Sequence, residues 1–313
     1  MSSSKTTATA FAPATVANVA VGFDLLGFPI EGVGDRVTVT RVAKPGVEIT
    51  GITGTVTTLP LDSQKNTATV GLLQMLKDVN ATFGFSVSIE KGIPMSSGMG
   101  GSASSSVAAV VAANAVLDQS FPIDKLFYYA MLGEQVASGG LHGDNIAPCL
   151  YGGLTLCRSI TPADIIHIPV PKDIFCVLIH PDLKVSTAES RAGLRKEVSL
   201  KDHVLQTAAF GGLMAGCFQN DLGLIQRSFQ DIIIEPQRAS QIPGFLETKA
   251  AALKVGAIGC AISGSGPSVF AWAKSKTDAI TIQSVMLQEF AKKNLKTDSW
   301  ISPISPSGAK VIA

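Results

Sequence analysis

A run of small residues between Pro94 and Ser105 could bind an anion through its backbone. It contains Gly98, Gly100 and Gly101 among several serines, and it leads into a stretch of alanine, serine and valine that predicts a helix. Residues without a Cβ atom let backbone N–H groups approach an anion closely, and the N-terminus of a helix adds unpaired donors and a positive dipole end. We interpret this segment as a phosphate-binding loop; a flexible surface turn before a core helix is the alternative.

The loop differs from two common nucleotide-binding motifs. No Gly-Lys-Ser or Gly-Lys-Thr follows at the spacing of a Walker loop, and the segment is not the Gly-x-Gly-x-x-Gly of dinucleotide-binding proteins. Phosphate bound here would therefore meet backbone donors and a helix terminus.

The composition excludes several classes of protein. The 25 Lys and Arg residues against 24 Asp and Glu give a formal charge of +1, without the basic surplus of a nucleic-acid-binding protein. Hydrophobic residues make up 46% of the chain, which excludes a disordered protein. The longest apolar stretch, 107–117, is too short for a membrane-spanning helix of about 20 residues, and residues 1–10 lack the apolar core of a secretion signal. We expect neither nucleic acid nor a membrane as a partner.

The cysteines indicate a reducing compartment. They lie far apart in apolar contexts, with no Cys-x-x-Cys pair and no histidine spaced for zinc. The five positions are Cys149, Cys157, Cys176, Cys217 and Cys260. We predict buried free thiols and a cytoplasmic location.

Hydrophobic periodicity predicts the elements that hold the loop in place. Strands joined by tight turns are expected over 11–42, with period-two alternation at 35–42. Further strands are expected at 47–58, 85–90 and 175–180, and a strand–turn–strand unit at 257–273. Helices are expected at 67–83, from the loop to about 119, and at 122–137, 200–218, 222–229, 244–255 and 278–294, with Asn66 as the first N-cap and Gly139-Gly140 ending the third helix. Strands and helices are interspersed without the rhythm of a doubly wound sheet, so we predict a two-lobed α+β fold.

Three segments resemble the three motifs of the GHMP small-molecule kinases. They are FAPATVANVAVGFD at 11–24, PMSSGMGGSASS at 94–105 and GCAISGSGPSVF at 259–270. The likeness extends from residue 11 to residue 311, and segments 18–24 and 141–148 resemble the homoserine kinases within that superfamily. It implies a GHMP kinase fold with a ribosomal-protein-S5-like ATP-binding lobe at 1–160 and a ferredoxin-like α+β lobe at 161–313.

The resemblance implies ATP and Mg²⁺ as cofactors. The implied ATP-binding residues are Asn66, Pro94, Met95, Ser96, Ser97, Gly98, Met99, Gly100, Gly101, Ser102, Ala103, Ser104 and Asn145. Mg²⁺, a hard ion that prefers oxygen ligands, would be held by Ser102 and Glu134. Without the resemblance, Glu134 would be taken as an exposed helix carboxylate. Gly101 departs from the family loop, which has a serine at that position.

The resemblance also implies L-homoserine as the second substrate. The implied contacts are Asn18, Asp24, His142, Thr187, Arg191, Arg238 and Gly264. Asp24 would pair with the ammonium group and Asn18 would hydrogen-bond the reacting hydroxyl. The guanidinium forks of Arg191 and Arg238 would meet the carboxylate, which a lysine cannot match.

Each of these residues has a simpler interpretation. Asn18 and Asp24 could be a pair of turn-forming Asx residues, and single arginines are mostly solvated. A lone loop histidine is more often structural or exposed, and we interpret His167, His180 and His203 in that way. The GSGP turn at 264–267 could be only a hairpin; the resemblance implies that it braces the phosphate loop.

The implied reaction is direct transfer of the γ-phosphoryl group of ATP to the side-chain hydroxyl of L-homoserine. The implied catalytic residues are Asn18, Asp24 and Glu134, and no strong general base is apparent because Asp24 would be ion-paired. Two alternatives stay open: a kinase for another small alcohol, such as mevalonate or diphosphocytidyl-methylerythritol, and a non-catalytic binding protein with the same fold. The family also implies a homodimer.

Overall fold

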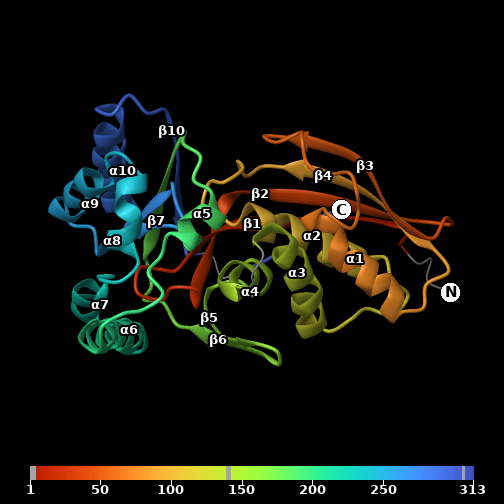
Figure 1. The fold of residues 1–313 in the computed structure, drawn as a ribbon, viewed down its shortest axis with the longest axis horizontal. Coiled ribbons are helices and arrows are strands. Elements are labelled where there is room, and N and C mark those ends of the chain that lie inside the picture. Colours follow the sequence, from red (N-terminus) through yellow and green to blue (C-terminus); the bar gives the residue numbers. More distant parts are fainter. Residues whose placement is uncertain (1–4, 139–141, 305–306) are drawn as a thin grey trace.

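The computed structural model describes residues 5–138, 142–304 and 307–313 as two lobes side by side (Figure 1). The first lobe contains a sheet of order β11-β1-β2-β4-β3, with β5 paired to β2 and β6 to β5. Its strands are β1 (Thr7–Ala17), β2 (Leu26–Val42), β3 (Gly46–Gly54), β4 (Gly84–Lys91), β5 (Leu154–Ile160), β6 (Ala163–Ile168) and β11 (Lys310–Val311). β3 is parallel to β4, and the other pairs are antiparallel.

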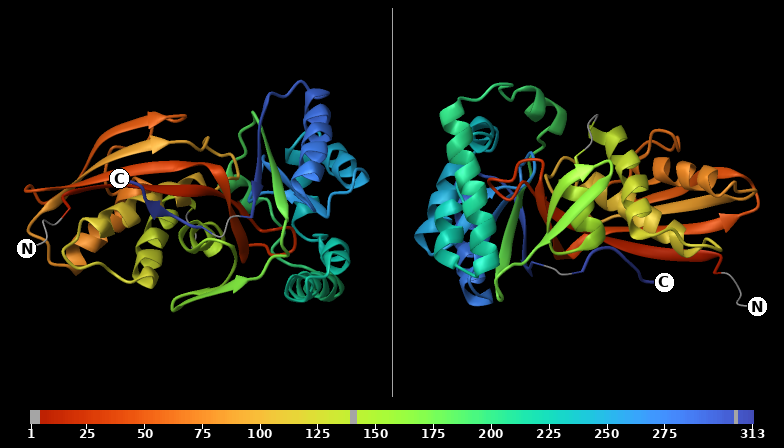
Figure 2. Two further views of the ribbon diagram at one scale, coloured as in Figure 1. Left: turned by 180° about the vertical axis from the view of Figure 1, so that it is seen from behind. Right: turned by 90° about the horizontal axis from the view of Figure 1, so that it is seen from below.

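Four helices cover one face of this sheet (Figures 1 and 2). They are α1 (Thr67–Asp78), α2 (Gly101–Ala115), α3 (Ile123–Ser138) and α4 (Gly143–Tyr151). α2 is buried along most of its length because its alanine, serine and valine side chains are small enough to pack between the sheet and the flanking helices. Alternate residues of β2 and β4, such as Val37, Val39, Val87 and Ile89, complete this core from the sheet side.

The second lobe is built on an antiparallel sheet of order β10-β7-β9-β8. The strands are β7 (Phe175–Pro181), β8 (Gly259–Ile262), β9 (Val269–Ala273) and β10 (Thr297–Pro303). The first strand of this lobe lies between its last and its third, which is the ferredoxin-like arrangement and confirms the predicted α+β class. The helices are α5 (Thr187–Ala192), α6 (Leu200–Gln219), α7 (Leu222–Ser228), α8 (Glu235–Arg238), the 3₁₀ turn η1 (Ala239–Gln241), α9 (Phe245–Lys254) and α10 (Lys276–Ala291).

The lobes are joined by a common core. Phe28 of β2 packs edge-on against Phe270 and Trp272 of β9, with ring centroids 5.9 and 5.8 Å apart. The first sheet also includes β6 and β11, which lie after residue 160 in the sequence. The predicted division at residue 160 stays a prediction.

Most predicted elements are present, and the missed ones are short. Asn66 caps α1 by accepting a hydrogen bond from the Ala68 N–H, as predicted. α4 was not predicted, because it is only nine residues long, contains Pro148 and begins three residues after the glycine pair 139–140. The predicted Gly139-Gly140 helix stop lies outside the described residues. The five cysteines are free and buried, which confirms that prediction.

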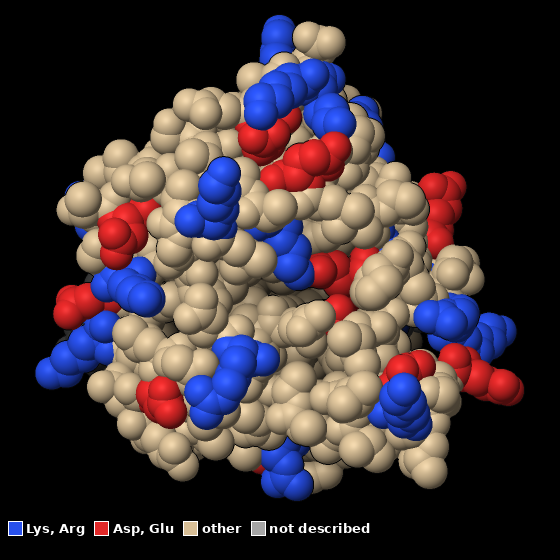
Figure 3. All heavy atoms as spheres, turned by 90° about the vertical axis from the view of Figure 1, so that its left-hand side faces the viewer, with Lys and Arg blue, Asp and Glu red and all other residues tan. Residues whose placement is uncertain are grey.

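The surface agrees with the near-zero net charge. Figure 3 shows the end of the molecule formed by the second lobe, where Lys and Arg lie interspersed with Asp and Glu. Within the described ranges, no helix combines the length and apolar character needed to span a bilayer.

Candidate active site

The glycine-rich loop joins β4 to α2 in a conformation that requires glycine. Gly98 and Gly100 have φ values of +73° and +67°, in the left-handed region. A Cβ atom on Gly98 would lie 2.5 Å from the Ser263 carbonyl oxygen, and one on Gly100 would overlap the Thr15 hydroxyl. Gly100 is the N-cap of α2 and contributes no side chain there. The first N–H groups of the helix are therefore left for a ligand.

The other two motifs brace this loop. The Thr15 N–H donates to the Met99 carbonyl (3.0 Å), and the Ser268 N–H donates to the Ser97 carbonyl (3.2 Å). The Ser263 hydroxyl donates to the Gly98 carbonyl at 2.6 Å. The bracing role predicted for the third motif is thus confirmed.

A cavity of about 390 Å³ opens along the loop, within the usual range for small-molecule sites. It is lined by Leu59, Pro60, Lys65 and Thr67 on one side, by Pro94–Gly98 and Gly100–Ser102 of the loop, and by Lys91, Ser105, Glu134 and Asn145. Three predicted ATP contacts, Met99, Ala103 and Ser104, are buried beneath the loop. Asn66 is also buried, with its side chain spent on the α1 cap and on the Pro60 carbonyl.

Ser102 and Glu134 meet at the wall of this cavity, as predicted. The Ser102 hydroxyl donates to Glu134 Oε2 at 2.8 Å. Glu134 is only 8% exposed, which excludes the interpretation as a solvated helix carboxylate. Two oxygen ligands from two helices, facing a phosphate-sized space, fit the preference of Mg²⁺ for a few protein oxygens plus phosphate and water.

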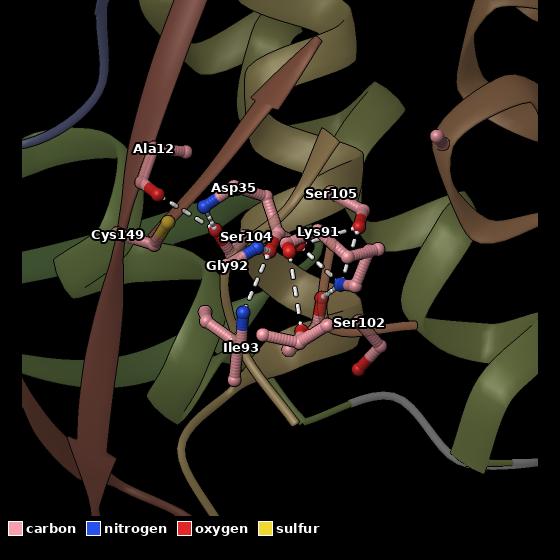
Figure 4. A network of polar contacts seen from close by, with 12 residues as sticks. Ala12, Asp35, Lys91, Gly92, Ile93, Ser102, Ser104, Ser105 and Cys149 are labelled. Atoms are coloured by element: carbon pink, nitrogen blue, oxygen red, sulfur yellow. Dashed lines mark hydrogen bonds and ion pairs between the residues drawn. The ribbon is translucent and has the colours of Figure 1, made fainter. Parts of the chain in front are cut away.

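A buried ion pair beneath the loop was missed by the sequence analysis (Figure 4). The Lys91 ammonium group pairs with Asp35 and donates to the Gly101 carbonyl and the Ser105 hydroxyl, both at 2.8 Å. Asp35 also accepts from the Ser105 hydroxyl at 2.6 Å and from the N–H groups of residues 92 and 93. The period-two patterns of β2 and β4 place both charges on the core face, and that signal could have found them.

The second cavity, of about 50 Å³, adjoins the first and shares Glu134, Asn145 and Thr187 with it. Here Arg191 donates to both carboxylate oxygens of Asp24, at 2.9 and 2.6 Å. His142 Nδ1 lies 3.4 Å from the same carboxylate. Burial lowers the pKa of the His142 imidazole, although the Asp24 carboxylate opposes the shift. Asp24 and Arg191, predicted to hold opposite ends of the substrate, are thus paired with each other in this structure.

Asn18 and Arg238 converge on one backbone carbonyl. The Asn18 side-chain amide and the Arg238 guanidinium each donate to the Gly264 oxygen at 2.8 Å. Arg238 is 3% exposed, and its Nε has no partner among the described residues. The guanidinium carbons of Arg191 and Arg238 lie 5.3 and 5.2 Å from the centre of the Phe23 ring. Neither arginine is therefore the solvated surface residue of the simpler interpretation.

The turn that carries Asn18 and Asp24 has a special backbone. Both residues have positive φ values, +71° and +61°, and the Asn18 side chain accepts a hydrogen bond from the Asp24 N–H at 3.1 Å. The turn formation of the simpler interpretation is thus present, through a hydrogen bond that spans six residues, and both side chains line the second cavity. Structural and functional interpretations coincide at this turn.

Thr187 and Arg191 lie on α5, one turn apart, and Thr187 hydrogen-bonds Ser265 at 3.0 Å. His142 is the N-cap of α4 and Asn145 lies in its first turn, so these residues belong to a helix start and not to the predicted loop. The Asn145 oxygen accepts from the Thr15 hydroxyl at 2.7 Å. The structure therefore brings all the predicted substrate residues to one cavity.

His180, predicted to be structural, is buried between strands, with Nδ1 3.1 Å from the Ser268 hydroxyl, and burial lowers its pKa. Asp144, which the sequence analysis did not select, lies in the same small cavity as Asp24 and Arg191.

Comparison with known proteins identifies the class. The model of the GHMP kinase N-terminal domain matches residues 66–153, and that of the GHMP kinase C-terminal domain matches residues 213–293. The chain therefore belongs to the GHMP kinases, and it is an enzyme.

Full-length relatives show to which family of GHMP kinases the chain belongs. Homoserine kinases of Xylella fastidiosa and Chlorobium phaeobacteroides are 45% and 43% identical to the chain, over 97% and 96% of it and 94% and 98% of their own length. The crystal structure of homoserine kinase from Cytophaga hutchinsonii matches with a TM-score of 0.96 at 44% identity, covering 100% of this chain and 99% of that one. Within the GHMP kinases, the chain belongs to the homoserine kinase family. A mevalonate kinase from L. major, 18% identical with a TM-score of 0.71 over 97% and 98% of the two chains, shares the fold.

Proposed function

We propose that this enzyme transfers the γ-phosphoryl group of ATP to the side-chain hydroxyl of L-homoserine, giving O-phospho-L-homoserine. The observation that carries the proposal is the junction of two unlike cavities. A glycine-rich cradle with few charged side chains opens onto a small cavity that contains Asp24, Arg191 and Arg238. One end suits a polyphosphate and the other suits a zwitterionic amino acid.

The nucleotide would lie along the first cavity. The loop N–H groups and the start of α2 would meet the phosphates, while Leu59, Pro60 and Thr67 would border the adenine. Ser102 and Glu134 would hold Mg²⁺, whose charge would offset that of the phosphates. Ser105 and Lys91 keep the carbonyl side of the first α2 turn fixed, so that the donors point toward the cavity.

Binding of the substrate would break the ion pair between Asp24 and Arg191. The ammonium group of the substrate would pair with Asp24, and its carboxylate would pair with the guanidinium groups of Arg191 and Arg238. One ion pair within the protein would thus be replaced by ion pairs between protein and substrate at both ends of the amino acid. Arg238 is buried with an unsatisfied Nε, which gives it a strong preference for an anionic partner.

Asn18 would orient the reacting hydroxyl. Its amide nitrogen donates to the Gly264 carbonyl, and its oxygen accepts a hydrogen bond from the backbone N–H of Asp24. These two bonds hold the side chain in one orientation. Phosphoryl transfer through a loose transition state depends mainly on positioning and charge stabilisation. The hydroxyl can therefore attack directly, without a strong general base.

A panel of alcohols tests the proposal. ADP release, measured with the purified protein, Mg·ATP and L-homoserine, mevalonate or shikimate, should be fast only with L-homoserine. Faster turnover of mevalonate would favour another small-alcohol kinase, and no turnover of any alcohol would favour a binding protein. Asn18→Ala should lower kcat far more than it weakens ATP binding, and an unchanged kcat would remove Asn18 from the reaction.

We also infer a cytoplasmic homodimer, which rests on the family resemblance. Light scattering coupled to gel filtration should give a mass near twice the 32.5 kDa of the chain. A mass of one chain at micromolar concentration would refute the dimer.

A further inference from the structure

A second carboxylate, that of Asp144, faces the small cavity without a salt bridge to any residue that the structure describes. Asp144 lies in the first turn of α4 and lines the cavity together with Asp24, Arg191 and Arg238. It is only 4% exposed. Within the ranges that the structure describes, no Lys, Arg or His forms an ion pair with it, whereas Asp24 has two such neighbours.

The two arginines that line the cavity with Asp144 have other hydrogen-bond partners. Arg191 is held by both oxygens of Asp24, and Arg238 donates to the Gly264 carbonyl. Glu134 is a third carboxylate at the same cavity and faces Ser102. His142 also lines this cavity, and burial lowers its pKa, which favours the neutral ring.

Burial therefore makes the ionised form of Asp144 costly. Desolvation first, and then the charges of Asp24 and Glu134, raise its pKa to about 7, against a smaller opposing effect of Arg191 and of its own N–H. The N-terminus of α4 favours an acidic residue in its first turn, but that preference is met equally well by an exposed side chain. A buried carboxylate in a substrate cavity is better explained by a cationic ligand group.

An amino-acid substrate supplies such a group. An ammonium has three hydrogen-bond donors, more than one carboxylate can use. With the carboxylate of the substrate on the arginines, its ammonium would need acidic acceptors. Asp24 and Asp144 line the cavity and could supply them, whereas Glu134 accepts from Ser102.

We propose that Asp144 is a second binding group for the α-ammonium of the substrate and that, with Asp24, it makes the enzyme reject the same alcohol when the amino group is missing. This inference rests on the proposed function, because it takes an amino acid as the occupant of the small cavity.

The test compares L-homoserine with 4-hydroxybutyrate, which is the same molecule without the amino group. Calorimetric binding of each compound, without nucleotide, gives a preference ratio for the wild type and for Asp144→Asn. We expect the substitution to weaken L-homoserine at least tenfold, to leave 4-hydroxybutyrate within threefold, and to leave the KM for ATP within twofold.

Asp231→Asn is the matched control. Asp231 is a buried carboxylate outside the small cavity, which accepts the N–H groups of Ile233, Ile234 and Glu235. That variant should lose thermal stability but keep the preference ratio.

Each of the following results for Asp144→Asn would overturn the inference. An unchanged ratio in Asp144→Asn, or an equal loss of both compounds, would overturn the inference. A variant that melts below the wild type at pH 8 would also overturn it, because it would reveal a structural partner for Asp144. Failure of the wild type to release ADP with L-homoserine would count against the proposed function, whereas the preference ratio is measured without turnover.

Discussion

The two ends of the site differ in the groups that they offer to a ligand. At the nucleotide end, the glycine-rich loop offers backbone N–H groups and a helix start. Of the two lysines that line this cavity, Lys65 is exposed, and Lys91 is buried in an ion pair beneath the loop. At the substrate end, the cavity is a cluster of charged side chains from distant segments. The near-zero net charge is compatible with a polyphosphate site because backbone, helix terminus and metal need no excess of Lys or Arg.

The two ends also differ in the contacts that hold their binding groups in place. The loop is fixed by hydrogen bonds within the protein, from both flanking motifs. The substrate end instead contains Asp24 and Arg191 in mutual contact, which the substrate would have to separate. Binding of L-homoserine should therefore be the step that rearranges side chains.

Breaking the ion pair under the loop should have the largest effect. Lys91→Met leaves Asp35 buried without a counter-charge, so we expect the free energy of unfolding to fall by about 3–5 kcal/mol. Urea titration measures this loss. The double variant with Asp35→Asn removes both charges and should recover part of it; a double variant less stable than Lys91→Met alone would show that the pair is not the source of the loss.

Distorting the loop should come next. Gly98→Ala places a Cβ atom against the Ser263 carbonyl at a positive φ, so the loop must shift. We expect kcat/KM for ATP to fall at least about 100-fold, the scale of a 1 Å misplacement, while L-homoserine binding without nucleotide stays within threefold. Gly101→Ala is the control, because its φ is not positive and its nearest neighbour is a side chain at 3.3 Å. Equal losses in the two variants would contradict the special role of Gly98.

The smallest expected effect concerns stability and pH. The pKa of Asp144 in the folded protein, about 7, lies above the usual value of 3.8. The folded state therefore carries no penalty below pH 4, an increasing one between pH 4 and pH 7, and a constant one above. Asp144→Asn should add about 1–2 kcal/mol to the free energy of unfolding at pH 8 and much less at pH 4.5, as measured by urea titration at both values. A gain that is equal at both would rule out ionisation as its cause.

The sequence predicted the nucleotide end better than the substrate end. The loop is contiguous, so glycine spacing and the following helix indicate its chemistry directly. Asp35 and Lys91 are readable as inward-facing charges, but their contact depends on the register of β2 with β4, in which Arg36 is opposite Glu90. Sequence alone does not fix that register.

At the substrate end, the same limit applies more strongly. Asp24 and Arg191 are 167 residues apart, and their contact requires α5 of one lobe to lie over the first turn of the other. Motif resemblance selected both residues but could not reveal that they pair with each other. Asp144 could not be selected from the sequence as a site residue, because its role depends on the burial of α4, a helix that the periodicity did not predict.

The claim that the two ends work separately is tested most directly by removing both cavity arginines. Arg191→Gln with Arg238→Gln keeps hydrogen-bond donors but deletes two positive charges next to the phosphate loop. The dissociation constant of Mg·ATP, measured by calorimetry, should stay within about threefold of the wild-type value, because backbone and helix donors carry phosphate binding. A loss of tenfold or more would mean that these arginines bind the nucleotide, and it would contradict the account.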